Sequence, residues 1–380
     1  MPGNNSITNS PSKIQSRKFQ YRSPDSISMS SSPDDFAHDI FRGLLDRDAD
    51  PSGLAAYGAM VTSGNRVGVI KSILSSAEWR RRMASPFNHF NSSIDAYTII
   101  QKHLNPDRAP KAGHVVNFLG VAVNRDFLPK HIASKLPDVE GPPNPANWHT
   151  DVSEVAAALR AVNLAEHTFT MIELGCGWGC WMNSTGVAAR RRGLNVHLIG
   201  IEGDPKHISF AREACATNGF STDEVQLYHG IAAASNGVAL FPRQDEAGES
   251  WGLEPIFHAD AKQRADALDA GGYIELPMIS LADAIGNHDR IDLLHIDIQG
   301  GEAELIRDCL RLITEKVAYL VIGTHSRQIE GTIFASLLAE QWLLEIERPA
   351  ILNLESPQPV VQVDGVQGWR NTRLNPVTQG

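Results

Sequence analysis

A strand–turn–helix pattern recurs from Phe169 to Gln341, and it limits the choice of folds more than any other feature of the chain. Each repeat begins with a short apolar run and continues into a stretch whose apolar residues have helical spacing. The apolar runs read TFTMIEL, NVHLIGIE, VQLYHGIAAA, IDLLHID and AYLVIGTH. This alternation predicts an α/β fold with a mainly parallel sheet and helices on both faces. Ligands of such sheets bind beyond the carboxyl ends of the strands.

The first turn of this pattern is rich in glycine. It reads E-x-G-x-G-x-G, from Glu173 through Gly175 and Gly177 to Gly179. A dinucleotide fingerprint requires glycine at the sixth position from Gly175, where this chain has Cys180. Glycines let the backbone approach a ligand closely, and the adjacent carboxylate suits a cationic ligand better than a pyrophosphate. S-adenosylmethionine carries an ammonium and a sulfonium group but no phosphate, so it fits these requirements.

The next two strands supply further candidate cofactor ligands. The run NVHLIGIE ends in Glu202, whose carboxylate can accept both hydroxyls of a ribose, as acids do in nucleotide-binding βαβ units. Gly230 and Ile231 follow the VQLYH strand and complete the predicted cofactor-binding set. Because Glu173 and Glu202 occupy matching strand ends, we interpret both as cofactor ligands rather than as solvated loop acids.

Composition divides the chain into four parts. Residues 1–34 contain ten serines and four prolines, and such a stretch cannot bury enough apolar surface to offset its ordering entropy. We therefore predict a disordered tail there, followed by a small helical module over residues 35–83. A proline-rich stretch, LPDVEGPPNPANW, marks the end of a predicted linker or cap region at residues 84–147. The main α/β domain is predicted over residues 148–380.

Charge and hydropathy argue against several functional classes. The net charge is −10, and the basic runs that stand out are two arginine triplets, so general nucleic-acid binding is not expected. No segment reaches the roughly 18 apolar residues that a membrane span needs, and the N-terminus lacks the apolar core of a signal peptide. The four cysteines do not have the spacing of a zinc site. We expect a cytoplasmic protein with reduced thiols.

Several segments of the main domain together form a recognisable pattern. They are MIELGCGWG, LIGIEGDP, VIGTHSRQIEG followed by WLLEIERP, and IDLLHIDIQGGEAELI, which parallels a K-I-D-x-E-G-x-E block. With these segments, residues 170–350 resemble a methyltransferase of the FkbM family, within the Rossmann-like class I S-adenosylmethionine-dependent fold, whose sheet has seven strands. The resemblance implies methyl transfer to a hydroxyl oxygen, commonly on a sugar or a polyketide-like acceptor.

The chain departs from the K-I-D-x-E-G-x-E block at two positions. His295 stands in place of the lysine, and Gln299 stands in place of the first glutamate. Asp297, Gly300 and Glu302 match the block. If that first glutamate has a catalytic duty, this protein must do without it.

The predicted helical module shows a second resemblance. The block from Phe41 to Trp79 contains a DRxxDPxGL turn and an SxEW ending. It is similar to a small helical module of unknown function that is distantly related to phycobilisome linkers. This resemblance implies attachment or protein docking through residues 35–83 rather than catalysis.

A hydroxyl acceptor must lose its proton as it attacks the methyl carbon, so a base is expected near the strand ends. Asp297 and His325 both end strands that face the predicted crevice, and His325 is preferred because its ordinary pKa is closer to neutrality. Alternatively, Asp297 and His325 hold a divalent ion that polarises the acceptor oxygen, although no third ligand is evident. His149 follows the proline-rich stretch and could fold over the acceptor, with Trp148 as a stacking surface for a sugar.

Two other functional classes stay open at this point. A NAD(P)-dependent sugar-modifying enzyme is one, although the missing sixth glycine counts against it. A non-catalytic scaffold on a methyltransferase-like fold is the other, although the retained acids and glycines count against it. The preferred hypothesis is an S-adenosylmethionine-dependent O-methyltransferase. Its acceptor is expected to be a sugar or glycan, such as a surface polysaccharide, or a related secondary metabolite.

Overall fold

A computed structural model describes residues 32–45, 47–244, 252–355 and 357–376. The predicted tail at residues 1–34 lies almost wholly outside these ranges. The chain divides into two compact units, Met1–Ser85 and Pro86–Gly380.

The first unit consists of short helices around a small apolar core. Its helices are α1 (Pro33–Leu45), α2 (Pro51–Thr62), α3 (Arg66–Leu74) and α4 (Ala77–Met83). Asp50, Asn65 and Ser76 cap the last three, each accepting a backbone N–H of the first turn. Phe36, Phe41 and other apolar side chains form a buried cluster of their own. The likeness of this unit to linker-type modules stays a prediction.

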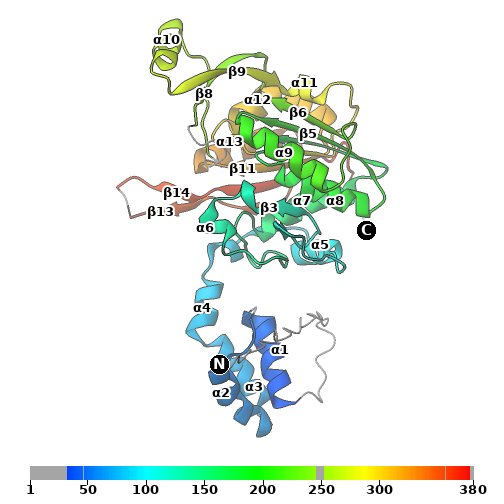
Figure 1. Ribbon diagram of the computed structural model, residues 1–380, viewed down its shortest axis with the longest axis vertical. Helices are drawn as coiled ribbons and strands as arrows, with labels where there is room; N and C mark the ends of the chain where they lie inside the picture. The colour runs from blue at the N-terminus through cyan, green and yellow to red at the C-terminus, as the bar shows by residue number, and fades with distance from the viewer. Residues whose placement is uncertain (1–31, 46, 245–251, 356, 377–380) are drawn as a thin grey trace, which may run out of the picture. The chain divides into compact units, whose positions relative to one another are not determined.

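Eight strands form the main sheet of the second unit, in the order β1–β12–β15–β11–β10–β4–β5–β6. Figure 1 shows two neighbours of this sheet, β5 and β6, side by side. Strands β6, β5, β4, β10 and β11 run parallel, whereas β15 is antiparallel to both of its neighbours. The bounds are β1 (Asn91–Ser92), β12 (Leu343–Arg348), β15 (Gly365–Arg370), β11 (Tyr319–Thr324), β10 (Leu293–Ile296), β4 (Thr168–Leu174), β5 (Asn195–Glu202) and β6 (Val225–His229).

This arrangement confirms the predicted Rossmann-like α/β class, with one strand more than the predicted seven. The additional strand, β1, comes from the region predicted to be a linker or cap, and it pairs with the edge strand β12. The rest of that region also packs within the second unit through α5 (Ala96–His103), β2 (His114–Val116), β3 (Ala122–Asn124) and α6 (Lys130–Ala133). Its apolar side chains, among them Phe118 and Val121, belong to the same buried cluster as the sheet.

Helices cover both faces of the sheet because side chains alternate along each strand. In β4, Phe169 and Met171 pack on one side, while Ile172 and Leu174 pack on the other. The first side carries α7 (Val152–Leu164), α8 (Cys180–Arg191) and α9 (Pro205–Thr217). The second carries α11 (Leu281–Ile285), α12 (Glu302–Lys316) and α13 (Arg327–Ala339).

The segment VQLYHGIAAA was predicted as one strand, but the structure divides it at Gly230. An added Cβ at Gly230 would lie 2.6 Å from the carbonyl oxygen of Pro277, so the backbones approach closely there. The second half enters a separate three-stranded sheet composed of β7 (Ile231–Ala233), β9 (Tyr273–Ser280) and β8 (Gly237–Pro242). Helix α10 (Ala261–Asp269) and the hairpin β13 (Ile351–Asn353) with β14 (Val360–Val363) complete the unit. No helix in the described part of the chain is long and apolar enough to cross a membrane.

Candidate active site

A cavity of about 220 Å³ lies at the carboxyl ends of β4, β5 and β10, where the parallel sheet was expected to bind its ligand. Its wall contains residues of the glycine loop and of the ends of β5 and β10. The start of the three-stranded sheet also contributes to the wall. The predicted residues that line it are Glu173, Gly175, Gly177, Glu202, Gly230, Ile231, Asp297 and His149.

The glycine loop adopts a backbone that other residues rarely adopt. Gly175, Gly177 and Gly179 have φ angles of +75°, +51° and +77°. A Cβ at Gly175 would lie 2.1 Å from the carbonyl oxygen of Asp297, so only glycine fits there without movement. A Cβ at Gly177 would meet nothing within 4 Å, so the loop leaves open space there for a ligand. Gly179 begins α8 as its N-cap.

Glu173 is buried, and its two oxygens already have partners. They accept the backbone N–H groups of Trp181, over 3.2 Å, and Met182, over 2.8 Å, in the first turn of α8. Burial raises the pKa of Glu173 to about 7, and nearby His295 opposes this effect. Glu173 therefore holds the glycine loop and α8 in place, in addition to lining the cavity.

Glu202 lies at the end of β5 with its carboxylate fixed by the backbone. Its Oε2 accepts the N–H of Gly177 and its Oε1 accepts the N–H of Asp204, each over 2.8 Å. Each carboxylate oxygen can accept a second hydrogen bond. The residue is only partly buried and lines the cavity, so it can accept hydroxyl groups from a ligand. The contact with Gly177 also couples this acid to the glycine loop.

The wall beside Glu202 is apolar. Gly230 N–H donates to the carbonyl oxygen of Glu202 over 2.9 Å, and Ile231 is buried immediately after it. Phe241 and Phe257, from the segments around β8, line the same part of the cavity. Apolar and aromatic side chains beside a hydroxyl-binding carboxylate fit the base and ribose of a nucleoside.

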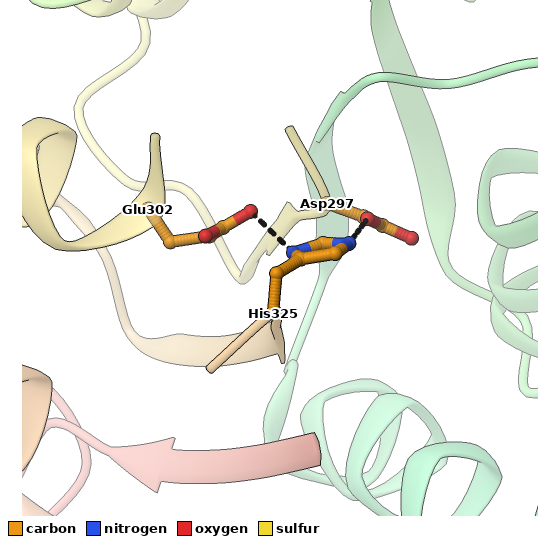
Figure 2. Close-up of side chains that lie close together, drawn as sticks. All are labelled: Asp297, Glu302 and His325. Atoms are coloured by element: carbon orange, nitrogen blue, oxygen red, sulfur yellow. Dashed lines mark ion pairs between the residues drawn. The ribbon is translucent and has the colours of Figure 1, made fainter. Parts of the chain in front are cut away.

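His325 lies in a cluster with two carboxylates (Figure 2). Its Nδ1 lies 2.9 Å from Oε1 of Glu302, and its Nε2 lies 3.4 Å from Oδ1 of Asp297. Asp364 is 3.8 Å from the same Nε2. Burial alone lowers the pKa of His325, but its contact with Glu302 and the surrounding negative charges raise it to about 9. The ring is therefore protonated at neutral pH.

This environment weighs against His325 as a simple base, and the role of this residue stays a prediction. A protonated imidazole cannot take a proton, and both of its nitrogens already face carboxylates. The cavity wall in the described ranges includes Asp297 but not His325. Within the described ranges, the side chains of Asp297, Glu302 and His325 form a group that could hold a metal ion, because one ligand atom of each lies within 4.8 Å of the others. In that alternative, Glu302 would be the third ligand, which was not evident from the sequence.

Asp297 connects this cluster to the cavity. Its backbone N–H donates to the carbonyl oxygen of Leu174, which fixes the end of β10 against β4. Gln299, held at a φ of +56°, donates through Nε2 to Oδ1 of Asp297 over 3.1 Å. Burial raises the pKa of Asp297 to about 6, with His325 opposing the effect. Because 42% of this side chain is accessible, water that enters the cavity weakens the shift.

His149 lines the cavity just before α7. Its ring lies 4.1 Å from that of Trp148 and 6.3 Å from that of Trp178, measured between centroids. Nδ1 of His149 is buried and has no hydrogen-bond partner in the described part of the chain. Burial lowers the pKa of His149 to about 4, so this ring is neutral at pH 7. Asp151, by contrast, caps α7 and pairs with Arg348 over 2.7 Å.

Two cavity residues, Glu154 and His295, were not predicted as site residues. His295 was noted only as a departure from a family block. One signal in the sequence could have indicated His295. This residue lies two positions before Asp297, so the two side chains lie on the same face of a strand and its extension. Glu154 lies on a helix distant in sequence, so its approach to His295 depends on tertiary packing.

Comparisons with known proteins agree with this geometry. Residues 168–345 match the family model described as "Methyltransferase FkbM domain". A protein of Jannaschia sp. (strain CCS1), named "Putative methyltransferase", is 46% identical over 262 residues, which cover 69% of this chain and 94% of that protein. The chain belongs to the FkbM methyltransferase family.

Solved methyltransferases also align with the chain. The FkbM methyltransferase from Methylobacillus flagellatus KT has 13% identity and a TM-score of 0.35, covering 57% of this chain and 54% of that one. The human methyltransferase 10 domain containing protein has 11% identity and a TM-score of 0.33, covering 58% and 84%. The assignment of this chain to the FkbM family therefore rests on the sequence matches. The description of the site rests on the geometry of this chain.

Proposed function

We propose that this FkbM family member transfers the methyl group of S-adenosylmethionine to a hydroxyl oxygen of a sugar or glycan, or of a related secondary metabolite. The observation that carries the proposal is the position of Glu202. Its carboxylate is held by the N–H of Gly177 in the glycine loop, at the wall of a cavity that also has an apolar face.

The glycine-loop end of the cavity fits the ribose, adenine and methionine parts of S-adenosylmethionine. Glu202 would accept the ribose hydroxyls, and Ile231 with Phe257 would enclose the adenine. The open face of Gly177 would let the methionine part approach the backbone. When bound, the sulfonium supplies an activated methyl group with a good leaving group. The contribution of the protein is then to bind, orient and accept a proton.

Orientation is the larger part of that contribution. Holding the acceptor oxygen in line with the methyl carbon can supply roughly 7–11 kcal/mol. Asp297 lines the cavity and is contacted by both His325 and Gln299, so it can accept a hydrogen bond from an acceptor hydroxyl in a fixed direction. We propose that His325 positions Asp297 as an ion-paired imidazolium, and that neither metal binding nor proton abstraction is its role.

The aromatic residues near His149 support a sugar as the acceptor. Trp178 lines the cavity, and the rings of Trp148 and His149 lie in contact beside it. Flat apolar surfaces next to hydrogen-bonding side chains suit the ring of a sugar, which has apolar faces and a polar rim.

A ligand-binding experiment distinguishes this proposal from the two other classes. S-adenosylhomocysteine should raise the melting temperature of the protein in a concentration-dependent way, because it binds the folded state. Stabilisation by NADH instead would favour the nicotinamide enzyme, and stabilisation by neither ligand would favour a non-catalytic scaffold. Label transfer from methyl-labelled S-adenosylmethionine to a panel of methyl glycosides then tests the acceptor class.

A further inference from the structure

The side chains of Glu154 and His295 form a hydrogen-bonded pair at the cavity wall. Nε2 of His295 lies 3.3 Å from Oε1 of Glu154, and the hydroxyl of Thr150 donates to Oε2 of Glu154 over 2.9 Å. The imidazole also stacks on Trp181, with ring centroids 5.3 Å apart and 28° between the ring planes. These contacts fix the orientation of the ring from two helices and a strand.

The second ring nitrogen of His295 has an unused hydrogen-bonding capacity. Nδ1 is buried and contacts no hydrogen-bond partner in the ranges that the structure describes. Buried polar atoms almost always have a partner, so a ligand atom is the expected partner for a nitrogen at a cavity wall. Because the carboxylate of Glu154 accepts a hydrogen bond, Nε2 carries the proton in the neutral ring. The lone pair is then on Nδ1.

The position of His295 relative to the glycine loop is fixed by strand register. His295 of β10 pairs with Glu173 of β4, and Glu173 holds the first turn of α8. Two residues further along, the carbonyl oxygen of Asp297 packs against Gly175. His295 therefore lines the same cavity as the glycine loop and Trp178.

We propose that His295 is the base that takes the proton of the acceptor hydroxyl, and that Glu154 is the residue that positions it. This inference rests on the proposed function. The acceptor oxygen forms a bond to the methyl carbon, and the carbon–sulfur bond breaks with its electron pair remaining on sulfur. The hydroxyl proton moves to Nδ1 of His295, and the resulting imidazolium is paired with Glu154.

The charges around the ring favour its protonated form after transfer. Glu154 faces it from α7, Glu173 from β4 and Asp297 from the end of its own strand. Val321 of β11 and Trp181 of α8, which lie against His295, are uncharged. Burial by itself lowers the pKa of His295, but these carboxylates raise it above its ordinary value. Since the ring must be neutral to accept a proton, the transfer rate should rise with pH through this raised pKa.

Three variants separate a base from a merely structural partner. H295Q keeps a polar side chain next to Glu154 but cannot take a proton, and H295N has a shorter amide that cannot take a proton either. E154Q removes the charge that raises the pKa of the ring. Single-turnover transfer to the glycosides methylated in the acceptor panel should slow at least 100-fold in both His295 variants, which is the lower range for a placed base. The exposed His131 of α6 supplies a control variant, H131Q, which should match the wild type.

A pH profile, a tautomer measurement and a binding affinity supply the remaining readouts. E154Q should shift the midpoint of the rate–pH profile to lower pH, and nitrogen NMR of the wild type should show His295 as the Nε2-protonated tautomer when neutral. Affinity for S-adenosylhomocysteine should stay within threefold in all variants. Near-wild-type rates in H295Q or H295N, or an Nδ1-protonated neutral ring, would overturn the assignment of His295. If the wild type binds S-adenosylhomocysteine but methylates no glycoside, the proposed acceptor class fails, and the tautomer decides on His295 alone.

Discussion

The two ends of the cavity differ in how their polar atoms are satisfied. At the glycine-loop end, Glu173 and Glu202 each accept a backbone N–H over 2.8 Å from the loop or the helix that follows it. At the acceptor end, Nδ1 of His149 and Nδ1 of His295 are buried without partners in the described residues. The glycine-loop end is thus a frame whose carboxylates are held by backbone N–H groups. The acceptor end instead has ring nitrogens that can still form a hydrogen bond with a ligand.

This difference indicates how the two ends constrain their ligands. The glycine-loop end is held by backbone groups, so its shape depends on the fold and suits one invariant ligand. The acceptor end is built from side chains of α7, β10 and the segment before α7, which can differ without altering the sheet. In the proposed function, the acceptor would accordingly be recognised by residues such as His149, Glu154 and His295.

The largest expected effect is on the frame. Gly175→Ala should destabilise the protein by about 3 kcal/mol, because it combines a left-handed backbone with a Cβ 2.1 Å from the oxygen of Asp297. Gly177→Ala is the matched control, with similar backbone strain but no clash, and should cost about 1 kcal/mol. It should instead weaken S-adenosylhomocysteine binding at least tenfold. Urea unfolding and calorimetry measure both quantities, and equal destabilisation by the two changes would contradict the frame.

The next effect concerns the cluster behind Asp297. Because the pKa of His325 is about 9 when folded and near 6.5 when unfolded, its contribution to stability is fully present below about pH 6.5. It is lost as pH rises through 9. The full shift corresponds to about 3 kcal/mol, which water at the partly accessible Asp297 should reduce to about 2 kcal/mol. The free energy of unfolding should therefore fall more between pH 6 and 10 in the wild type than in His325→Gln. Parallel pH profiles for the two proteins would show that His325 is not an ion-paired imidazolium in the folded protein.

A smaller effect is expected from metal removal. If His325 is an ion-paired imidazolium between Asp297 and Glu302, a chelator should change the single-turnover rate by less than about twofold. The melting temperature should also stay constant. Loss of activity with a chelator, and its return with magnesium or manganese, would establish the alternative in which Asp297, Glu302 and His325 hold an ion.

The smallest expected effect comes from removing the first unit. Both ends of the cavity are built from the unit Pro86–Gly380, and the first helices have a separate core. A protein that begins at Pro86 should bind S-adenosylhomocysteine within about twofold of the full chain. A truncated protein that does not fold would show that residues 1–85 support the frame.

Much of the frame was predictable because it depends on local sequence. The glycines and the acid at the end of β5 are adjacent to the strands that position them, so the motif around Gly177 and the place of Glu202 followed from spacing. The engagement of Glu173 by α8 was not foreseen, since a strand-end acid can face either a ligand or the next helix. The division of the third strand at Gly230 depends on the distant Pro277 backbone.

The acceptor end was less predictable because its contacts are distant in sequence. Glu154 and His295 are 141 positions apart, and no periodicity connects a helix turn with a strand at that distance. The preference for His325 used its ordinary pKa, whereas Glu302 and Asp297 alter that pKa after folding. Residue type and strand-end placement were therefore insufficient to choose between two histidines on neighbouring strands.

The central claim, that the glycine-loop end binds the methyl donor, is tested most directly by calorimetric titration of S-adenosylhomocysteine. The wild type should bind one equivalent, and Glu202→Gln should bind about 10–100-fold more weakly through the loss of charged hydrogen bonds. Glu304→Gln, at an exposed position of α12, should bind like the wild type. Unchanged affinity in Glu202→Gln, or no binding by the wild type, would contradict the account.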